Sequence, residues 1–424
     1  MKRSNALISA AAIAFAIGAG LPGWASAATN EQKVSAIQNG LNWLYNNQQA
    51  GGYWNYGGYE QAVTAAAISA FVSQKPLWGA NAAAYQAAVD NGMNYLLGGA
   101  TVNTVGVRSD GLNPCGSGTC TGVYWYGSGE ATYTTGLVAT AVGQYAAGNG
   151  SQVATNSGPL AGMTWTQIAQ GVTNEFAAGQ TTADHGDRRG GWRYFPNSGD
   201  SDGSTTQWAV LSMIYDQSLG ATTPNFVKTE LNYWLSADSF GAGGAGCYQP
   251  GYLCEQSDTG SLLLGLSFVG RGPGDPTVDA ALGWLNAHWQ EGANNTWYGN
   301  FGHPYAMWSD YKALELQIGK GDTTTITNLG SCGTLSPGVV CNWWQNYNES
   351  LVTTQNGDGS WSGYSNWTGP LATAWNVSLL GGTILPPPDN GGIPEPATWA
   401  MMLTGFFGVG ATMRARRRRV ALAR

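Results

Sequence analysis

Ionisable side chains gather in one short stretch of a chain that is otherwise poor in charge. Between residues 184 and 202 the sequence places four acids, one histidine and three arginines: Asp184, His185, Asp187, Arg188, Arg189, Arg193, Asp200 and Asp202. A histidine close to aspartates has the groups that general acid–base catalysis requires. The candidate catalytic residues are therefore His185, Asp187, Asp200 and Asp202. A salt-bridged loop that only stiffens this part of the molecule explains the same composition.

Acids also stand at the start of several apolar, helix-like segments. They are Glu60, Glu130, Asp258 and Asp310. A negative side chain suits the N-terminal end of a helix, so capping is one interpretation. The other is that these helix ends face a shared cavity. Together with polar and aromatic neighbours of the charged stretch, the candidate ligand-binding residues are Arg189, Arg193, Trp192, Tyr194, Glu130, Asp258 and Asp310.

The sequence offers no convincing metal site. Asp200, Asp202 and Ser204 alternate as in a calcium loop, but no acid follows at the position that closes an EF-hand. The cysteine spacings do not match a zinc knuckle. We therefore expect neither a metal nor a cofactor.

Helix-like segments of two kinds alternate along the chain. Amphipathic segments, with apolar residues at three- and four-residue steps, are expected at about 31–48, 81–98, 165–179, 224–237, 275–290 and 340–355. Smaller, more apolar segments are expected at about 59–73, 130–146, 204–218, 257–269, 305–319 and 369–381. Helices with one polar face belong outside, and helices that are apolar all round belong inside. The pattern predicts an all-α fold, a single (α/α)6 toroid of six helical hairpins over 28–384. An open solenoid is the alternative.

The connections between these segments carry a repeated motif. Gly40-Leu41-Asn42-Trp43-Leu44 is followed by Gln48, Gly52 and Trp54, and Gln355 to Trp361 repeats its core. This motif resembles the repeat of squalene cyclases, and the chain is similar over about 30–383 to the terpenoid cyclase/protein prenyltransferase family. The resemblance implies the same toroid, in which glutamine, glycine and tryptophan join neighbouring hairpins.

The active-site motifs of that family match only in part. Its cyclases carry Asp-x-Asp-Asp-Thr-Ala at the start of an inner helix, and the closest stretch is Asp200-Ser201-Asp202-Gly203-Ser204-Thr205. By this resemblance Asp202 takes the place of the acid that protonates an alkene, while Gly203 departs from the motif. The region 300–308 is similar to the zinc-ligand region of prenyltransferases but lacks its cysteine, which argues against zinc.

Both ends of the chain read as export signals. Residues 1–27 have a basic start, an apolar run and a small-residue cleavage site, as in a secretory signal peptide with its helix. A Pro/Gly linker at 385–393 leads to a tail at 394–424, in which Pro394, Glu395 and Pro396 precede an apolar transmembrane helix at 397–413 and an arginine cluster. The tail resembles the PEP-CTERM sorting signal of Gram-negative bacteria. A plain tail anchor is the alternative.

That resemblance implies partners and a destination. An exosortase and the secretion machinery would process the chain, the inner membrane would hold it beforehand, and the ring would reach the periplasm, the cell surface or the extracellular matrix. Residues 28–393 contain 10 basic and 24 acidic side chains, a net charge of −14, so nucleic acid is excluded as a partner. Six cysteines in three close pairs favour disulfides in an oxidising compartment, with Cys115/Cys120, Cys247/Cys254 and Cys332/Cys341 as the simplest connectivity.

Three functions are compatible with these features. The first is a cyclase-like or prenyltransferase-like toroid that binds or acts on an apolar small molecule at the ring mouth. The second is a toroid that binds or cleaves exopolysaccharide, since aromatic residues are dense in the connections and stack on sugar rings. The third is a non-catalytic surface or matrix protein. A deep apolar cavity, an open aromatic groove with paired carboxylates, or a ring centre plugged by side chains would distinguish them.

Overall fold

The computed structural model describes residues 28–388, apart from 197, 238–240, 295–296 and 331–340. Most of the described chain is helical, as predicted. The outer helices are α1 (Asn30–Asn46), α3 (Ala82–Gly98), α5 (Trp165–Gly179), α7 (Asn225–Ala237), α9 (Pro276–His288) and α11 (Trp343–Thr354). The inner helices are α2 (Glu60–Ser73), α4 (Ala131–Tyr145), α6 (Gly203–Ser218), α8 (Gln256–Phe268), α10 (Pro304–Gln317) and α12 (Gly369–Gly381). All twelve lie within a few residues of the predicted segments.

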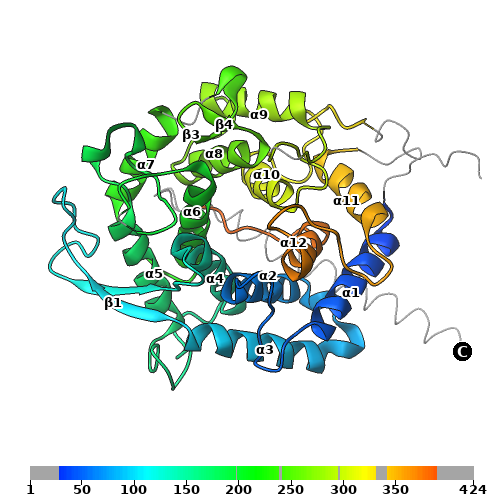
Figure 1. The fold of residues 1–424 in the computed structure, drawn as a ribbon, viewed down its shortest axis with the longest axis horizontal. Helices are drawn as coiled ribbons and strands as arrows, with labels where there is room; N and C mark the ends of the chain where they lie inside the picture. The colour runs from blue at the N-terminus through cyan, green and yellow to red at the C-terminus, as the bar shows by residue number, and fades with distance from the viewer. Residues whose placement is uncertain (1–27, 197, 238–240, 295–296, 331–340, 389–424) are drawn as a thin grey trace, which may run out of the picture.

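The two kinds of helix form two concentric layers (Figure 1). Each inner helix packs against the next, and α12 packs against α2, so the contacts of the inner layer close on themselves. Burial follows the sequence pattern: α6 buries every residue from Gly203 to Asp216, whereas α1 buries one stripe that includes Ile37, Leu41 and Leu44. A helix that is buried all round must have neighbours on every side, and the inner layer provides them.

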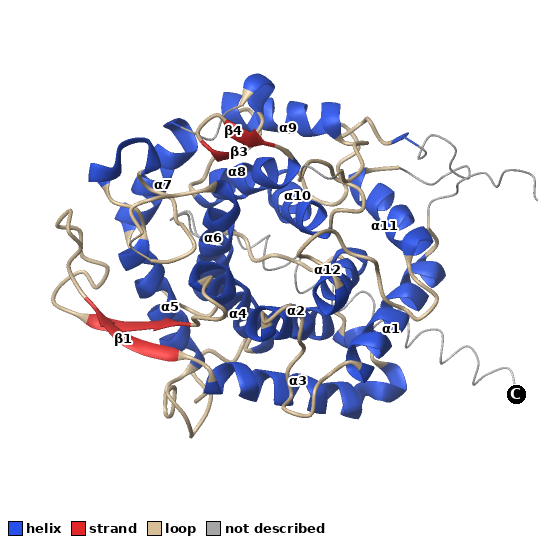
Figure 2. Ribbon diagram, in the orientation of Figure 1, coloured by secondary structure: helices blue, strands red, loops and turns tan. Residues whose placement is uncertain are grey.

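In the described connections between the helices, the structure has two short antiparallel hairpins and four 3-10 turns (Figure 2). The strands are β1 (Thr101–Val105) with β2 (Cys120–Tyr124), and β3 (Cys247–Gln249) with β4 (Tyr252–Cys254). The turns are η1 (Lys75–Leu77), η2 (Gly79–Asn81), η3 (Ala183–Arg188) and η4 (Ala242–Gly244). The sequence analysis did not predict the strands, because each is short and lies in a glycine-rich connection.

Two of the three predicted disulfides are present, Cys115–Cys120 beside β2 and Cys247–Cys254 across β3 and β4. Cys341 is also disulfide-bonded, while Cys332 lies outside the described residues. Within the described ranges, no helix is long and apolar enough to span a bilayer. The predicted signal peptide (1–27), the sorting triplet (394–396) and the apolar segment 397–413 lie outside those ranges.

Four buried tryptophans each tie an outer helix to the next inner one. The indole N–H of Trp54 donates to the Leu44 carbonyl at 2.7 Å, and its backbone N–H donates to the Thr64 hydroxyl of α2 at 2.9 Å. The same pair of bonds is formed by three other tryptophans, at 125, 192 and 361. A repeated tryptophan therefore satisfies a helix-end carbonyl and fixes the hairpin at once.

Glutamines join one hairpin to the next. Gln48 donates to the Ala88 carbonyl of α3, and Gln180 donates to the Val227 carbonyl of α7. Gln355 makes the equivalent bond across the closure of the ring, from the last hairpin to the Ala36 carbonyl of α1, at 2.8 Å. Gly359, with φ of 93°, lies against α1 at the same junction, where a Cβ would stand 2.6 Å from the Asn39 carbonyl oxygen. The last and first hairpins are thus linked as neighbouring hairpins are elsewhere.

The closure bond can be tested with Gln355→Leu. We expect the variant to lose about 1–3 kcal/mol of unfolding free energy, because the carbonyls of Ala36 and Gly359 lose their donor. Chemical denaturation measures this loss. Gln38→Leu is the control, because the hydrogen bond that Gln38 donates to the Leu77 carbonyl is exposed to solvent. Equal stability of the two variants would show that the closure bond contributes nothing.

Candidate functional site

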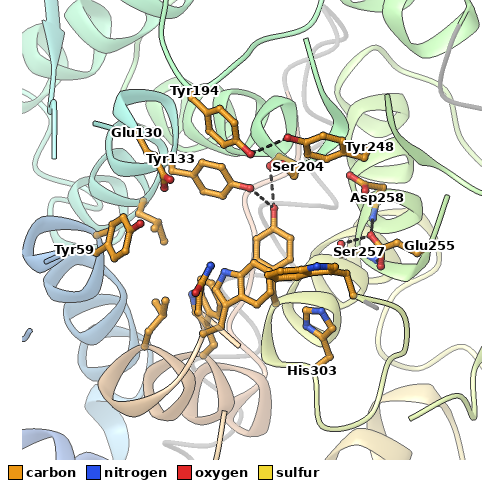
Figure 3. A pocket seen from close by; sticks show the side chains of 18 of the residues that line it. Tyr59, Glu130, Tyr133, Tyr194, Ser204, Tyr248, Glu255, Ser257, Asp258 and His303 are labelled. Atoms are coloured by element: carbon orange, nitrogen blue, oxygen red, sulfur yellow. Dashed lines mark hydrogen bonds between the residues drawn. The ribbon is translucent and has the colours of Figure 1, made fainter. Parts of the chain in front are cut away.

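A cavity of about 420 Å³ opens where the N-terminal ends of the six inner helices converge (Figure 3). Every inner helix, or the residue or turn just before it, contributes to its lining. Nine of the lining side chains are aromatic rings of tyrosine or tryptophan: Tyr59, Tyr133, Tyr194, Tyr248, Tyr252, Trp297, Tyr305, Trp367 and Trp375. Three are acids: Glu130, Glu255 and Asp258. We call this space the ring-mouth cavity.

Stacked rings form one wall of the ring-mouth cavity. Tyr305 of α10 and Trp367, just before α12, are nearly parallel, with centroids 4.7 Å apart and planes at 15°. The imidazole of His303 lies 5.1 Å from Trp367, and burial lowers the pKa of His303 to about 4. A neutral imidazole beside flat indole and phenol rings makes this wall apolar and uncharged. Such a wall binds the face of a ring or of an alkene.

Side chains fill the ring centre beneath this wall. The Tyr305 hydroxyl accepts from the Gln207 amide at 2.6 Å and donates to the Ser204 carbonyl at 2.9 Å. The carbonyl oxygen of the same Gln207 side chain accepts a hydrogen bond from Lys312 at 2.8 Å. The Lys312 ammonium lies 4.3 Å from the Trp208 ring and is fully buried, and this burial lowers its pKa well below the usual value. The cavity therefore ends at a closed floor.

Two neighbouring carboxyl groups stand at the start of α8, where burial raises the pKa of both. Glu255 accepts from the backbone N–H groups of Ser257 and Asp258, at 2.9 and 3.0 Å, and from the Ser257 hydroxyl. These three donors stabilise the charged form of Glu255. Asp258 has no such donors: its Oδ1 is buried with no hydrogen-bond partner among the described residues. Burial, and then the nearby Glu255 carboxyl group, raise the pKa of Asp258 well above its usual range, which favours the protonated form of this acid.

Glycine at position 203 makes room for that carboxyl group. Gly203 is the first residue of α6, and a Cβ there would lie 2.5 Å from Oδ1 of Asp258. Gly203 is the position at which the sequence departs from the cyclase motif. The Asp258 carboxyl group of α8 occupies the space that a side chain at 203 would need. An aspartate at 203 would clash with Asp258.

Asp202, the predicted acid of the cyclase motif, caps α6 and does not line the cavity. Its Oδ1 accepts from the Thr205 backbone N–H at 2.7 Å and from the Ser204 hydroxyl at 2.6 Å. Its Oδ2 pairs with Arg193 at 2.8 Å. Complete burial raises the pKa of Asp202 to about 6, although these partners act in the opposite direction.

The charged stretch around Asp202 forms a network on the rim. Asp200 pairs with Arg188 and Arg193 at 3.6 and 3.3 Å, and Arg189 forms a bidentate pair with Glu230. His185 contacts Thr182 and Asp184. Asp187 pairs with Arg188 at 3.6 Å and is largely exposed. In the described part of the chain, no hydrogen bond or ion pair joins His185 to the other three catalytic candidates.

The predicted ligand-binding residues separate into two groups. Tyr194, Glu130 and Asp258 line the ring-mouth cavity. Arg193 lies just behind it, with its guanidinium 4.8 Å from the Tyr194 ring and 5.2 Å from the Tyr248 ring. Arg189, Trp192 and Asp310 do not reach it: Arg189 pairs with Glu230, Trp192 is buried under the hairpin, and Asp310 is buried within hydrogen-bonding distance of Tyr347.

Sequence reasoning did not select Glu255, Ser257, Tyr133, Tyr305 or Trp367 as site residues. All five stand at or near the N-terminal ends of inner helices, and the acids that begin these helices are the signal that points there. Among the described residues, no group of three His, Cys, Asp or Glu side chains is placed to hold a metal ion.

No protein-family model matches the chain, and the comparison with curated proteins found no match. Solved structures that are similar include the following two. One is a protein from Actinoplanes, with 14% identity and a TM-score of 0.47, covering 83% of this chain and 98% of that one. The other is a type II terpene cyclase variant from Scytonema in complex with geranylgeranyl dihydroxybenzoate, with 13% identity and a TM-score of 0.45, covering 83% and 97%. This is a distant structural similarity and assigns no activity.

The raised pKa of Asp202 makes a prediction about stability. The pKa of Asp202 is about 6 in the fold, against an ordinary value of 3.8. Raising the pH from 3.8 to 6 therefore lowers the free energy of unfolding by about 3 kcal/mol at most. Asparagine does not ionise, so the unfolding free energy of Asp202→Asn does not fall in this way. We expect its melting temperature, relative to the native protein, to rise progressively between pH 4 and pH 7. A flat profile for Asp202→Asn would contradict the effect of burial.

Proposed function

We propose that this protein binds a neutral ligand with apolar faces in the ring-mouth cavity, where Asp258 donates a proton to it. The observation that carries this proposal is a buried carboxyl group that lacks hydrogen-bond donors and stands beside aromatic walls. Asp258 has an unpartnered Oδ1, lines the cavity, and stands next to Glu255. A protonated acid in a dry, aromatic site can transfer its proton to an electron-rich group of the ligand.

The lining restricts the class of ligand. An anion would meet Glu255, whose charge three hydrogen bonds stabilise. Aromatic faces such as Tyr305 and Trp367 favour flat or unsaturated apolar groups. An isoprenoid-like small molecule, whose alkene accepts a proton from Asp258, fits both conditions. The carboxylate left behind would lie at the start of α8, where the helix dipole favours negative charge.

A neutral sugar is the second candidate, and a specific observation favours it. The wall across from the stacked rings carries hydroxyl groups: Tyr194 and Tyr248 are hydrogen-bonded to each other at 2.8 Å, with Ser204 and Ser257 beside them (Figure 3). The aromatic wall can stack on one face of a pyranose ring, and the hydroxyl and carboxyl groups of the other wall can bind the hydroxyl groups of the sugar. Asp258 would then protonate a glycosidic oxygen.

A non-catalytic surface role is the third candidate. The filled ring centre below Tyr305 is what a purely structural ring would contain, but the cavity above it has space for a ligand. We propose that the two ends of the chain direct its export. Residues 1–27 would act as a signal peptide, and an exosortase would cut the PEP-CTERM-like tail near 394–396. The disulfides Cys115–Cys120 and Cys247–Cys254 are compatible with export.

Asp258→Asn and Asp202→Asn test the assignment of the acid as a matched pair. Both acids are buried at the start of adjacent inner helices, but only Asp258 lines the cavity. We expect Asp258→Asn to lower turnover by a factor of about 10² or more, which is the contribution that a general acid makes to the rate. Ligand binding, measured by calorimetry, should be retained. Asp202→Asn should keep most of its turnover. The reverse result would return the catalytic role to Asp202.

Trp367→Ala tests the ligand class when binding to isoprenoid alcohols and to neutral oligosaccharides is measured in parallel. Loss of the stacked wall should weaken binding by about 1 kcal/mol or more, or at least fivefold. The control is Trp284→Ala, because Trp284 stacks on His288 of α9, away from the cavity. If the native protein binds neither class, the proposed function is wrong.

A further inference from the structure

The six inner helices all point the same way. Their N-terminal ends line the ring-mouth cavity, so their C-terminal ends lie together at the opposite face of the ring, which we call the far face. At 1.5 Å per residue, the 16 residues of α6 span about 24 Å between the two faces. Because α12 is an inner helix, the chain leaves the ring at the far face.

The segment after α12 packs against the far face of the ring. Gly382 ends the helix in the left-handed conformation, with φ of 64°. The Tyr311 hydroxyl donates to the Thr383 carbonyl at 2.6 Å, and Lys320 donates to the Gly382 carbonyl at 3.1 Å. Leu385 is only 4% exposed and belongs to the core. This segment therefore holds the exit of the chain firmly against the far face.

The start of the ring is held at the same face. Lys33, in the first turn of α1, lies over the ring of Trp344 with its ammonium 4.6 Å from the centroid. The Trp344 indole donates to the Leu379 carbonyl near the end of α12, at 2.9 Å. Lys320 approaches the same indole at 5.9 Å. The beginning of α1 and the end of α12 thus meet at one tryptophan, and both chain ends leave on the side opposite the cavity.

We infer that, until the tail is cut near 394–396, the far face is the surface that meets the lipid bilayer, and that the ring-mouth cavity opens away from it into water. A stiff Pro386-Pro387-Pro388 spacer leads from the far face toward the apolar segment predicted at 397–413. The rim of the mouth carries Asp184 and Asp187, with side chains 68% and 64% exposed, and anionic headgroups repel them. The ligand then arrives from the aqueous side and is not drawn from the bilayer.

This inference depends on the proposed membrane segment but not on the identity of the ligand. Single cysteines introduced into the full chain test it: Ile384→Cys marks the far face, and Tyr126→Cys marks the mouth side, where it precedes the cavity residue Glu130. Their native side chains are 64% and 54% exposed. Each variant is labelled with a fluorescent maleimide without reduction and reconstituted into phosphatidylcholine–phosphatidylglycerol vesicles. A nitroxide on the lipid headgroups then quenches the label according to its distance.

We expect the label at 384 to be quenched several-fold more than the label at 126, relative to vesicles without nitroxide. Equal quenching at both positions, or stronger quenching at 126, would overturn the orientation. Quenching at neither position would overturn the attachment to the bilayer itself. Ligand binding by the same labelled proteins is measured separately, so a failure of the proposed function is distinguishable from a failure of this orientation.

Discussion

The shared direction of the six inner helices is the constraint on which the site depends. It brings six helix N-termini to one mouth, where each adds a partial positive charge and backbone N–H groups that have no partner within the helix. These groups attract carboxylates, whereas burial disfavours the charged form. The start of α8 combines both effects in adjacent residues. Glu255 takes the backbone donors, which favour its charged form, and Asp258, whose Oδ1 has no partner, has its pKa raised well above the usual range by burial.

The same closure creates an interior that must be filled. Apolar side chains alone would pack there without a unique arrangement, but the ring centre contains a chain of specific polar contacts. Lys312 donates to Gln207, and Gln207 donates to Tyr305, so the orientation of the amide is determined at both ends. The cost of burying an amine is offset by the Trp208 face and by the Gln207 oxygen. The result is a rigid floor that keeps the Tyr305 ring stacked on Trp367.

Helix positions could be predicted from the sequence because each hairpin repeats the same local pattern of polarity. The repeated motif also indicated the joints: Gln48 and Gln355 bond to neighbouring hairpins, and Trp54 and Trp361 lie buried beneath them. The acid of the site was less accessible to sequence reasoning. Asp258 was named among several helix-start acids as a candidate ligand-binding residue, and not as a catalytic one. Its importance comes from the lateral contact between α6 and α8, where Gly203 leaves space, and a linear motif does not reveal such a contact.

The junction between the last and first hairpins has a consequence for chain connectivity. Gln355 binds α1 as Gln48 binds α3, and Lys33 and the end of α12 meet at Trp344. The covalent break between the ends is therefore bridged by the same kind of bond that joins continuous hairpins at Gln48 and Gln180. A circular permutant that joins the two ends and begins at another outer helix would retain this bond within a continuous chain.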